Sequence, residues 1–166
     1  MVSAAATDFT YTNYNVTADT TGPTAPAISF GGYTSGTWTT QNISFTLSGG
    51  SDGTGSGIQK LQYKISSAGT WTNYSTAVTI STEGETTIYA RAVDNAGNVT
   101  PDAQAATATA KIDKTAPAVT FNPNGGTFNG DASISITCVD SVSGVASSKY
   151  IWAASSTPPA DTNSKR

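Results

Sequence analysis

Histidine is absent from the 166-residue sequence, and cysteine occurs only once. Without histidine the chain lacks the most common general base, which excludes Ser-His-Asp and Cys-His catalysis and imidazole zinc sites. The single cysteine, Cys138, cannot form a disulfide within the chain, so we expect the core alone to hold the fold together. Charged residues make up only 11%, and the net charge is −3. This charge supplies no basic stripe for nucleic acid or for an anionic membrane surface, so neither is expected as a partner.

Long apolar segments are also missing. No run approaches the roughly 18 apolar residues of a membrane-spanning helix. The start, MVSAAATDF, has neither the basic region nor the apolar stretch of a signal peptide, so the address of a secreted protein would lie outside this sequence. The strong helix formers Leu, Glu and Lys are scarce, whereas Thr, Val, Ile and Tyr are residues that fit a half-buried pleated sheet. The composition therefore predicts an all-β chain.

Apolar and polar residues alternate in short segments between turns rich in Gly, Ser, Asn and Asp. In one segment Ile43, Phe45 and Leu47 alternate with serine and threonine. Such alternation predicts strands with one wet face, and six or seven of them at this spacing fit an antiparallel β-sandwich. The predicted strands are 27–30, 43–47, 61–65, 78–80, 88–94 and 106–112.

The sequence also repeats itself. TAPAISF at 24–30 recurs as TAPAVTF at 115–121, an offset of 91 residues, which suits a small β-sandwich module. NISFTL followed by SGI in the first copy matches SISITC followed by SGV in the second, and this match places Cys138 at the inward position of Leu47. We therefore expect a complete module at 24–114 and the N-terminal part of a second module at 115–166. Residues 1–23 are expected to be the last strand and linker of a preceding repeat.

The two ends suggest how incomplete modules are completed. YNVTAD at 14–19 resembles ATAKID at 108–113, the last strand of the complete module, whereas 115–166 holds enough residues for the first three strands only. Half a sandwich would expose an apolar face. One hypothesis is therefore that the last strand of one copy adds to the first strands of another, giving a homo-oligomer by strand exchange.

One stretch carries a family resemblance. GTWTNYSTAVTISTEGETTIYARAVDNAGNVT at 69–100, with the linker IDKTAP and the D-x-x-S-G-V loop at 140–145, resembles bacterial immunoglobulin-like repeats. The resemblance implies immunoglobulin-like modules in tandem on extracellular or cell-surface bacterial proteins. The implied function is that of a non-catalytic spacer that displays an adhesive or enzymatic head, with neighbouring modules as partners. The matched positions are Gly69, Trp71, Thr72, Tyr74, Glu83, Gly84, Thr87, Ile88, Arg91, Ala92, Asp94, Ala96, Gly97 and Asn98.

Acidic and amide side chains cluster near the predicted strand ends, most densely in DNAGN at 94–98. Calcium prefers about 6 to 8 oxygen ligands, so these side chains are candidate ligands although no D-x-D-x-D-G loop is present. The alternative that the residues favour is a structural turn, in which the Asp94 carboxylate accepts backbone N–H groups, Gly97 supplies a permissive backbone and Asn98 adds an amide. The calcium candidates are Asp52, Asp94, Asn95, Asp113 and Asp140.

Aromatic residues offer a second kind of site. Trp71 and Tyr74 are three residues apart and could stack on the faces of sugars, as a carbohydrate-binding or adhesion module would require. Their positions in the resembled family indicate packing instead. Paired carboxylates can hydrolyse glycosides, but no spacing here indicates a catalytic pair, and we expect no enzyme and no cofactor other than calcium.

Overall fold

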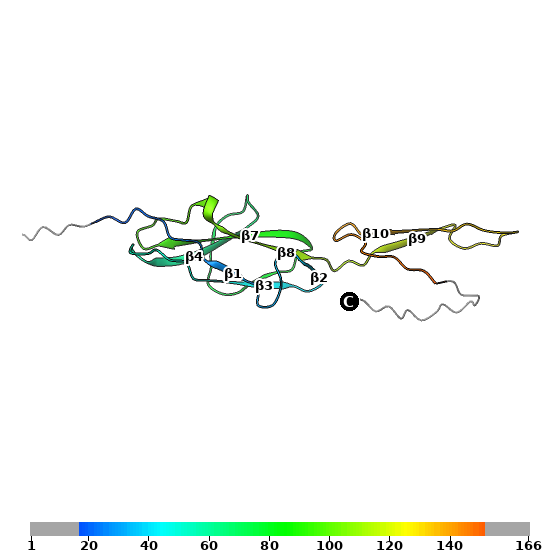
Figure 1. Cartoon of the computed structure of the whole chain (residues 1–166), viewed down its shortest axis with the longest axis horizontal. Coiled ribbons are helices and arrows are strands. Elements are labelled where there is room, and N and C mark those ends of the chain that lie inside the picture. The colour runs from blue at the N-terminus through cyan, green and yellow to red at the C-terminus, as the bar shows by residue number, and fades with distance from the viewer. Residues whose placement is uncertain (1–16, 152–166) are drawn as a thin grey trace, which may run out of the picture. The chain divides into compact units, whose positions relative to one another are not determined.

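The computed structural model describes residues 17–151, and within them it is all-β apart from one turn of 3-10 helix (Figure 1). The all-β class predicted from composition is thus confirmed. No helix in this part of the chain is long and apolar enough to cross a membrane. The elements are β1 (Ala27–Ser29), β2 (Trp38–Thr39), β3 (Ile43–Ser48), β4 (Ile58–Ile65), β5 (Thr72–Asn73), β6 (Val78–Ile80), β7 (Gly84–Asp94), η1 (Asp102–Gln104), β8 (Ala106–Ile112), β9 (Ala118–Asn122) and β10 (Ser135–Val139).

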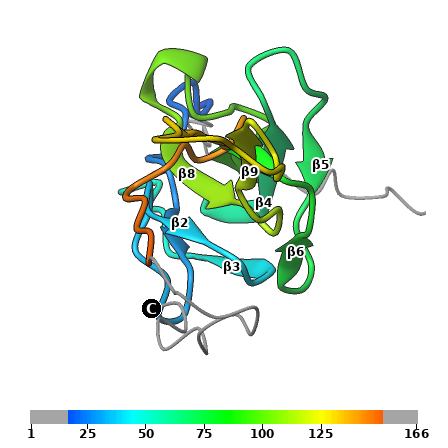
Figure 2. The same cartoon turned by 90° about the vertical axis from the view of Figure 1, so that its right-hand side faces the viewer.

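These strands form three sheets. The largest has the order β2-β8-β7-β4-β5, the second has the order β1-β3-β6, and β9 pairs with β10 in a two-stranded sheet. β2 pairs with β8 in parallel, whereas β4 pairs antiparallel with both β5 and β7, and β3 does so with both β1 and β6. In Figure 2, β3 and β6 lie together on one side and β8 on the other. Several antiparallel sheets of this kind are compatible with the predicted β-sandwich.

The chain divides into two compact units. Among the described residues, one contains 17–29 together with Thr46–Ala77 and Ile88–Thr107. The other contains Phe30–Phe45, Val78–Thr87 and 108–151. Because β3, β7 and β8 contribute to both units, this division follows spatial compactness and does not test the repeat boundaries expected at residues 24 and 115.

In the first unit, the predicted alternation holds on β7 and fails on β4. Ile88, Ala90, Ala92 and Asp94 share one face of β7 and are fully buried. On β4, alternation predicted an inward face that includes Leu61 and Ile65, yet Leu61 is only half-buried and Ile65 is exposed. The opposite face is covered as well, because its Gln62 and Lys64 contact side chains of β7 and of the segment around β5. Both faces of β4 are therefore partly buried.

In the second unit, Ile43 and Phe45 of β3 and Ile80 of β6 are buried. The pairing of β3 with β6 places Ile43 opposite Ile80. Phe30 packs edge-on against Phe45, with ring centroids 6.5 Å apart, a geometry favoured by the quadrupoles of aromatic rings. Apolar residues at alternate positions thus form the core of this unit.

The two-stranded sheet has the same pairing register as β1 with β3. Ala27 pairs with Ser48, and 91 residues later Ala118 pairs with Val139; the next two pairs of each ladder match in the same way. The sequence offset of 91 residues is therefore reproduced in three dimensions. Burial differs, since Cys138, expected to be buried like Leu47, is only half-buried.

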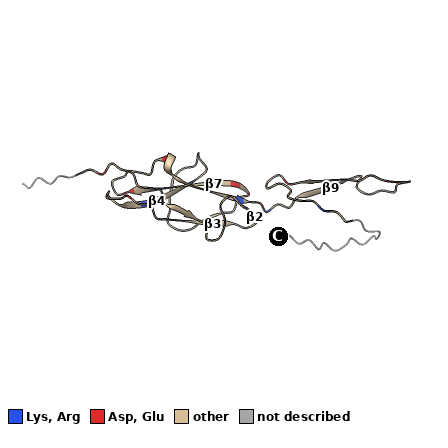
Figure 3. Cartoon of the chain, in the orientation of Figure 1, with Lys and Arg blue, Asp and Glu red and all other residues tan. Residues whose placement is uncertain are grey.

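Charged side chains are sparse along the described strands, and no basic stripe follows any of them (Figure 3). Cations and carboxylates occur close together in places, as with Lys111 and Glu85, whose Nζ and Oε2 atoms lie 2.9 Å apart. Charged side chains therefore occur as local clusters. Two of these clusters, one of carboxylates and one of cations, lie in the first unit.

Candidate functional site at the linker

The turn that follows β7 is organised by one buried carboxylate. Asp94 is fully buried, and its Oδ1 accepts the backbone N–H of Asn98 at 2.8 Å while its Oδ2 accepts the Asn98 side-chain amide at 2.9 Å. Gly97 has a φ of +95°, a backbone conformation that side chains with a Cβ rarely adopt. The alternation along β7 placed Asp94 at the inward end of the strand, and the structure has it there.

This turn also holds the linker that precedes the first strand. The Asn98 amide donates a second hydrogen bond, 3.1 Å long, to the carbonyl oxygen of Asp19. Gly22 lies so close to the turn that a Cβ at this position would collide with the carbonyl oxygen of Val99. Farther along the linker, the Thr24 N–H donates to the Ser51 carbonyl at 2.8 Å. The linker is thus fixed to the turn and to the loop around residue 51.

The Asp19 side chain binds a second loop. Its Oδ2 accepts the backbone N–H of Ser56 at 2.8 Å, and its Oδ1 accepts that of Thr21 at 3.1 Å. The hydrogen bond from Ser56, with a smaller contribution from Thr21, lowers the pKa of Asp19 below its ordinary value. Asp19 therefore acts as an ionised clasp between the linker and the loop.

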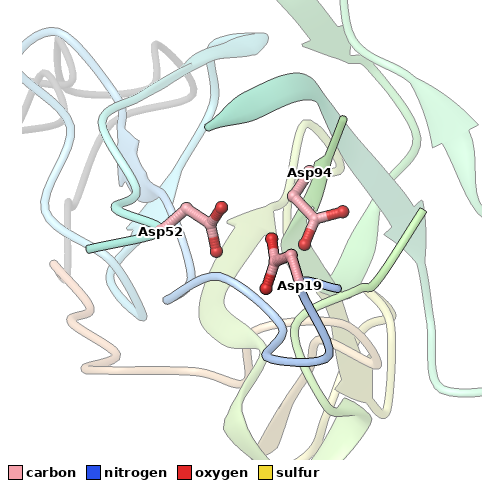
Figure 4. Close-up of side chains that lie close together, drawn as sticks. All are labelled: Asp19, Asp52 and Asp94. Atoms are coloured by element: carbon pink, nitrogen blue, oxygen red, sulfur yellow. The ribbon is translucent and has the colours of Figure 1, made fainter. Parts of the chain in front are cut away.

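Three carboxylates converge where these elements meet. One oxygen each of Asp19, Asp52 and Asp94 lies within 4.8 Å of the others, and Figure 4 shows the three side chains directed toward one another. Asp52 accepts the Gly57 N–H through Oδ2 at 2.7 Å, whereas its Oδ1 is buried without a hydrogen-bond partner. Carboxylates this close repel one another unless a cation or a proton lies between them. Hard oxygen donors in this arrangement suit Ca²⁺, with carbonyl groups or water completing the shell.

The structure brings together two of the five predicted calcium candidates. Asp52 and Asp94 belong to the cluster, whereas Asn95 directs its amide nitrogen to the carbonyls of Ser56 and Gly57, at 2.8 and 3.1 Å. Sequence reasoning missed Asp19. The match of YNVTAD with ATAKID could have found it, because that match places Asp19 at the position of Asp113, which was a candidate.

Asp113 and Asp140 belong to the second unit, where they form a similar contact. Asp113 is buried, and its Oδ2 is hydrogen-bonded to the Ser143 hydroxyl. Asp140 Oδ1 accepts the backbone N–H groups of Ser143 and Gly144, at 3.1 and 3.3 Å. The same arrangement therefore occurs at two places in the chain. In each, a linker aspartate is hydrogen-bonded to the serine of a D-(x)n-S-G loop, Asp19 to Ser56 and Asp113 to Ser143.

The predicted sugar-stacking residues are both half-buried. The Trp71 ring lies against two cations, with the Arg91 guanidinium carbon 4.2 Å and the Lys64 Nζ 4.8 Å from its centroid. Tyr74 donates its backbone N–H to the Leu61 carbonyl at 2.9 Å, continuing the β4–β5 pairing. A neutral sugar would have to share the Trp71 ring with these cations.

The geometry thus defines a linker clasp with a carboxylate cluster at its centre, together with a separate cationic cluster around Trp71. Neither arrangement contains a histidine, and the only cysteine, Cys138, belongs to neither. No family model, curated protein or solved structure matches this chain in the comparisons with known proteins.

Proposed function

We propose that the chain is part of a tandem array of immunoglobulin-like modules that serves as a non-catalytic spacer in an extracellular or cell-surface bacterial protein. The observation that carries this proposal is the common register of β1–β3 and β9–β10 at an offset of 91 residues. A sequence repeat that also repeats its strand pairing supports successive copies of one structural unit.

The two linker clasps support the spacer role. A string of modules holds a head at a fixed distance only if the linkers are ordered, since a flexible linker collapses toward a random coil. Both linkers carry an aspartate hydrogen-bonded to the loop serine that follows it, Ser56 in one case and Ser143 in the other. Asn98 adds a hydrogen bond to the first linker. Each linker is thus tied to the loop that follows it in sequence.

Force spectroscopy tests the spacer proposal. A chain tethered through its ends should show a discrete unfolding event for residues 24–114, which releases a contour length of about 300 Å at ~3.3 Å per extended residue. A spacer under tension needs such a barrier. Extension of the chain without any discrete event would contradict the proposal.

Calcium binding at the linker is a second candidate function, and the buried, unpartnered Oδ1 of Asp52 favours it. A cation between Asp19, Asp52 and Asp94 would relieve their repulsion and tie the linker to the turn. Millimolar Ca²⁺ should then raise the melting temperature, because a ligand that binds only the folded state stabilises it. Asp52→Asn should abolish this increase, and Asp140→Asn should leave it unchanged. A melting temperature unmoved by Ca²⁺ and by EDTA would exclude the site.

Assembly by strand complementation remains a proposal as well. Within the described residues β10 pairs only with β9, and Phe121 and Ile136 are 49% and 41% exposed. The proposed occupant is the segment 14–19 of a second copy, because it resembles β8, the last strand of the complete module. Since β8 pairs with β2 and β7 and not with β3, this segment would cover the exposed apolar face of the β9–β10 pair and would not extend its edge. Light scattering should show a mass that rises with concentration, and Ile136→Asp should keep the chain monomeric. A wild-type chain that stays monomeric at high concentration would contradict complementation.

A further inference from the structure

Two cations are held against one indole ring on the β4–β7 part of the largest sheet. The Lys64 Nζ lies 4.8 Å from the centroid of Trp71 and 5.3 Å from that of Tyr89, while the Arg91 guanidinium carbon is 4.2 Å from the Trp71 centroid. The Lys64 and Arg91 side chains are only 11% and 18% exposed. Cations are rarely withdrawn this far from water unless they are paired.

Their pairing is incomplete. The nearest carboxylate is that of Asp102, whose Oδ2 is 3.7 Å from Lys64 Nζ and whose Oδ1 is 3.6 Å from an Arg91 terminal nitrogen, both beyond hydrogen-bond distance. Arg91 donates its Nε to Gln62 at 2.9 Å, whereas within residues 17–151 the Lys64 ammonium makes no hydrogen bond. Burial lowers the pKa of Arg91, and Asp102 opposes this only in part. Both cations retain donors for a better-placed anion.

The segment that carries Asp102 is suited to moving aside. The 3-10 turn η1 has no buried residue and no side-chain cap, and the Asp102 side chain is 64% exposed. The turn is held by the backbone hydrogen bonds Gln104 N to Pro101 O and Ala105 N to Asp102 O. Segments with few buried contacts open at low free-energy cost.

We propose that Lys64, Arg91 and Trp71 form a binding site for a uronate carboxylate of an acidic polysaccharide, which the Asp102 carboxylate occupies in the free protein. Asp102 already spans the two cations with its two oxygens, so the site fits a planar, two-oxygen anion. The proposal is independent of the spacer function.

The surroundings favour a sugar as the carrier of that anion. The Gln62 side-chain amide donates to the side-chain oxygen of the exposed Asn73 at 2.9 Å and accepts the Arg91 Nε–H through its own oxygen. Two amide groups therefore lie next to Arg91. Amide groups are donors and acceptors for the hydroxyl groups of a sugar. An acidic peptide such as polyglutamate offers carboxylates without hydroxyl groups.

Affinity electrophoresis on polygalacturonate at low ionic strength tests the proposal, with neutral dextran and polyglutamate as comparison matrices. Asp102→Asn removes the competing carboxylate and should lower the Kd for polygalacturonate at least threefold relative to wild type. Asp131→Asn makes the same change of charge at another exposed position and should have a smaller effect. Lys64→Gln should weaken binding by at least tenfold, while Lys64→Arg should retain it; circular dichroism would check that each variant is folded.

Three results would overturn the proposal. Equal affinities of the Asp102→Asn and Asp131→Asn variants would mean that only overall charge matters. Binding of the Lys64→Gln variant as tight as that of wild type would exclude the cationic cluster. Retention on polyglutamate as strong as on polygalacturonate would exclude recognition of a sugar.

Discussion

Strands β3 and β10 have the same sequence pattern and different surroundings. Both alternate apolar and polar residues, and each pairs with the preceding repeat-related strand in the same register. Yet Ile43 and Phe45 are 3% and 0% exposed, whereas Ile134 and Ile136, which occupy the equivalent positions, are 38% and 41% exposed. β3 has a second neighbour, β6, and among the described residues β10 has none. Alternation thus determines which residues share a face, and the other strands of a module determine whether that face is buried.

The largest expected effect comes from truncating Phe45, for which its equivalent Ile136 provides the comparison. Phe45→Ala should lower the free energy of unfolding by about 3 to 5 kcal/mol, because it removes a fully buried ring and leaves a cavity. Ile136→Ala should cost about 1 kcal/mol or less, because much of that side chain already contacts solvent. Urea unfolding followed by circular dichroism measures both values. Equal losses would mean that the β9–β10 face is covered in solution.

A smaller effect is expected at the turn after β7. Asp94→Ala should lower stability by roughly 1 to 3 kcal/mol, because the Asn98 N–H loses its acceptor inside the protein. Asp140→Ala provides the comparison in the second copy. Its carboxylate accepts the backbone N–H groups of Val142, Ser143 and Gly144, but Asp140 is only half-buried whereas Asp94 is fully buried, so the loss should be smaller. An Asp94→Ala variant as stable as wild type would contradict the structural role of the turn.

The contrast between the copies shows what sequence could and could not predict. Most of the strands, the inward end position of Asp94 and the 91-residue offset follow from local periodicity and repetition, which a sequence displays directly, whereas the two-residue strands β2 and β5 were not predicted. Asp19 lies close to Asp52 and Asp94 because the linker contacts Ser56, which is 37 residues away in sequence. Periodicity contains no information about such a long-range contact. Alternation along 61–65 predicts a solvent-facing position for Lys64. Its burial depends on Trp71, Tyr89 and Arg91, which reach it from other segments.

The smallest expected effect is a pH dependence of the first linker clasp. Because the hydrogen bonds from Ser56 and Thr21 lower the pKa of Asp19 below its ordinary value of 3.8, the folded protein favours the ionised form. The resulting stabilisation is complete above pH ~4 to 5 and disappears as the pH falls through the lowered pKa of the folded state. Asp19→Asn should therefore melt below wild type at neutral pH, and the difference should shrink as the pH falls below ~3.8. The exposed Asp131→Asn variant should follow wild type throughout. A difference in melting temperature that stays constant down to acidic pH would show that Asp19 contributes through its shape and not through its charge. The clasp would then have to rest on the hydrogen bond from the Asn98 side-chain amide to the Asp19 carbonyl and on the close packing of Gly22 against Val99.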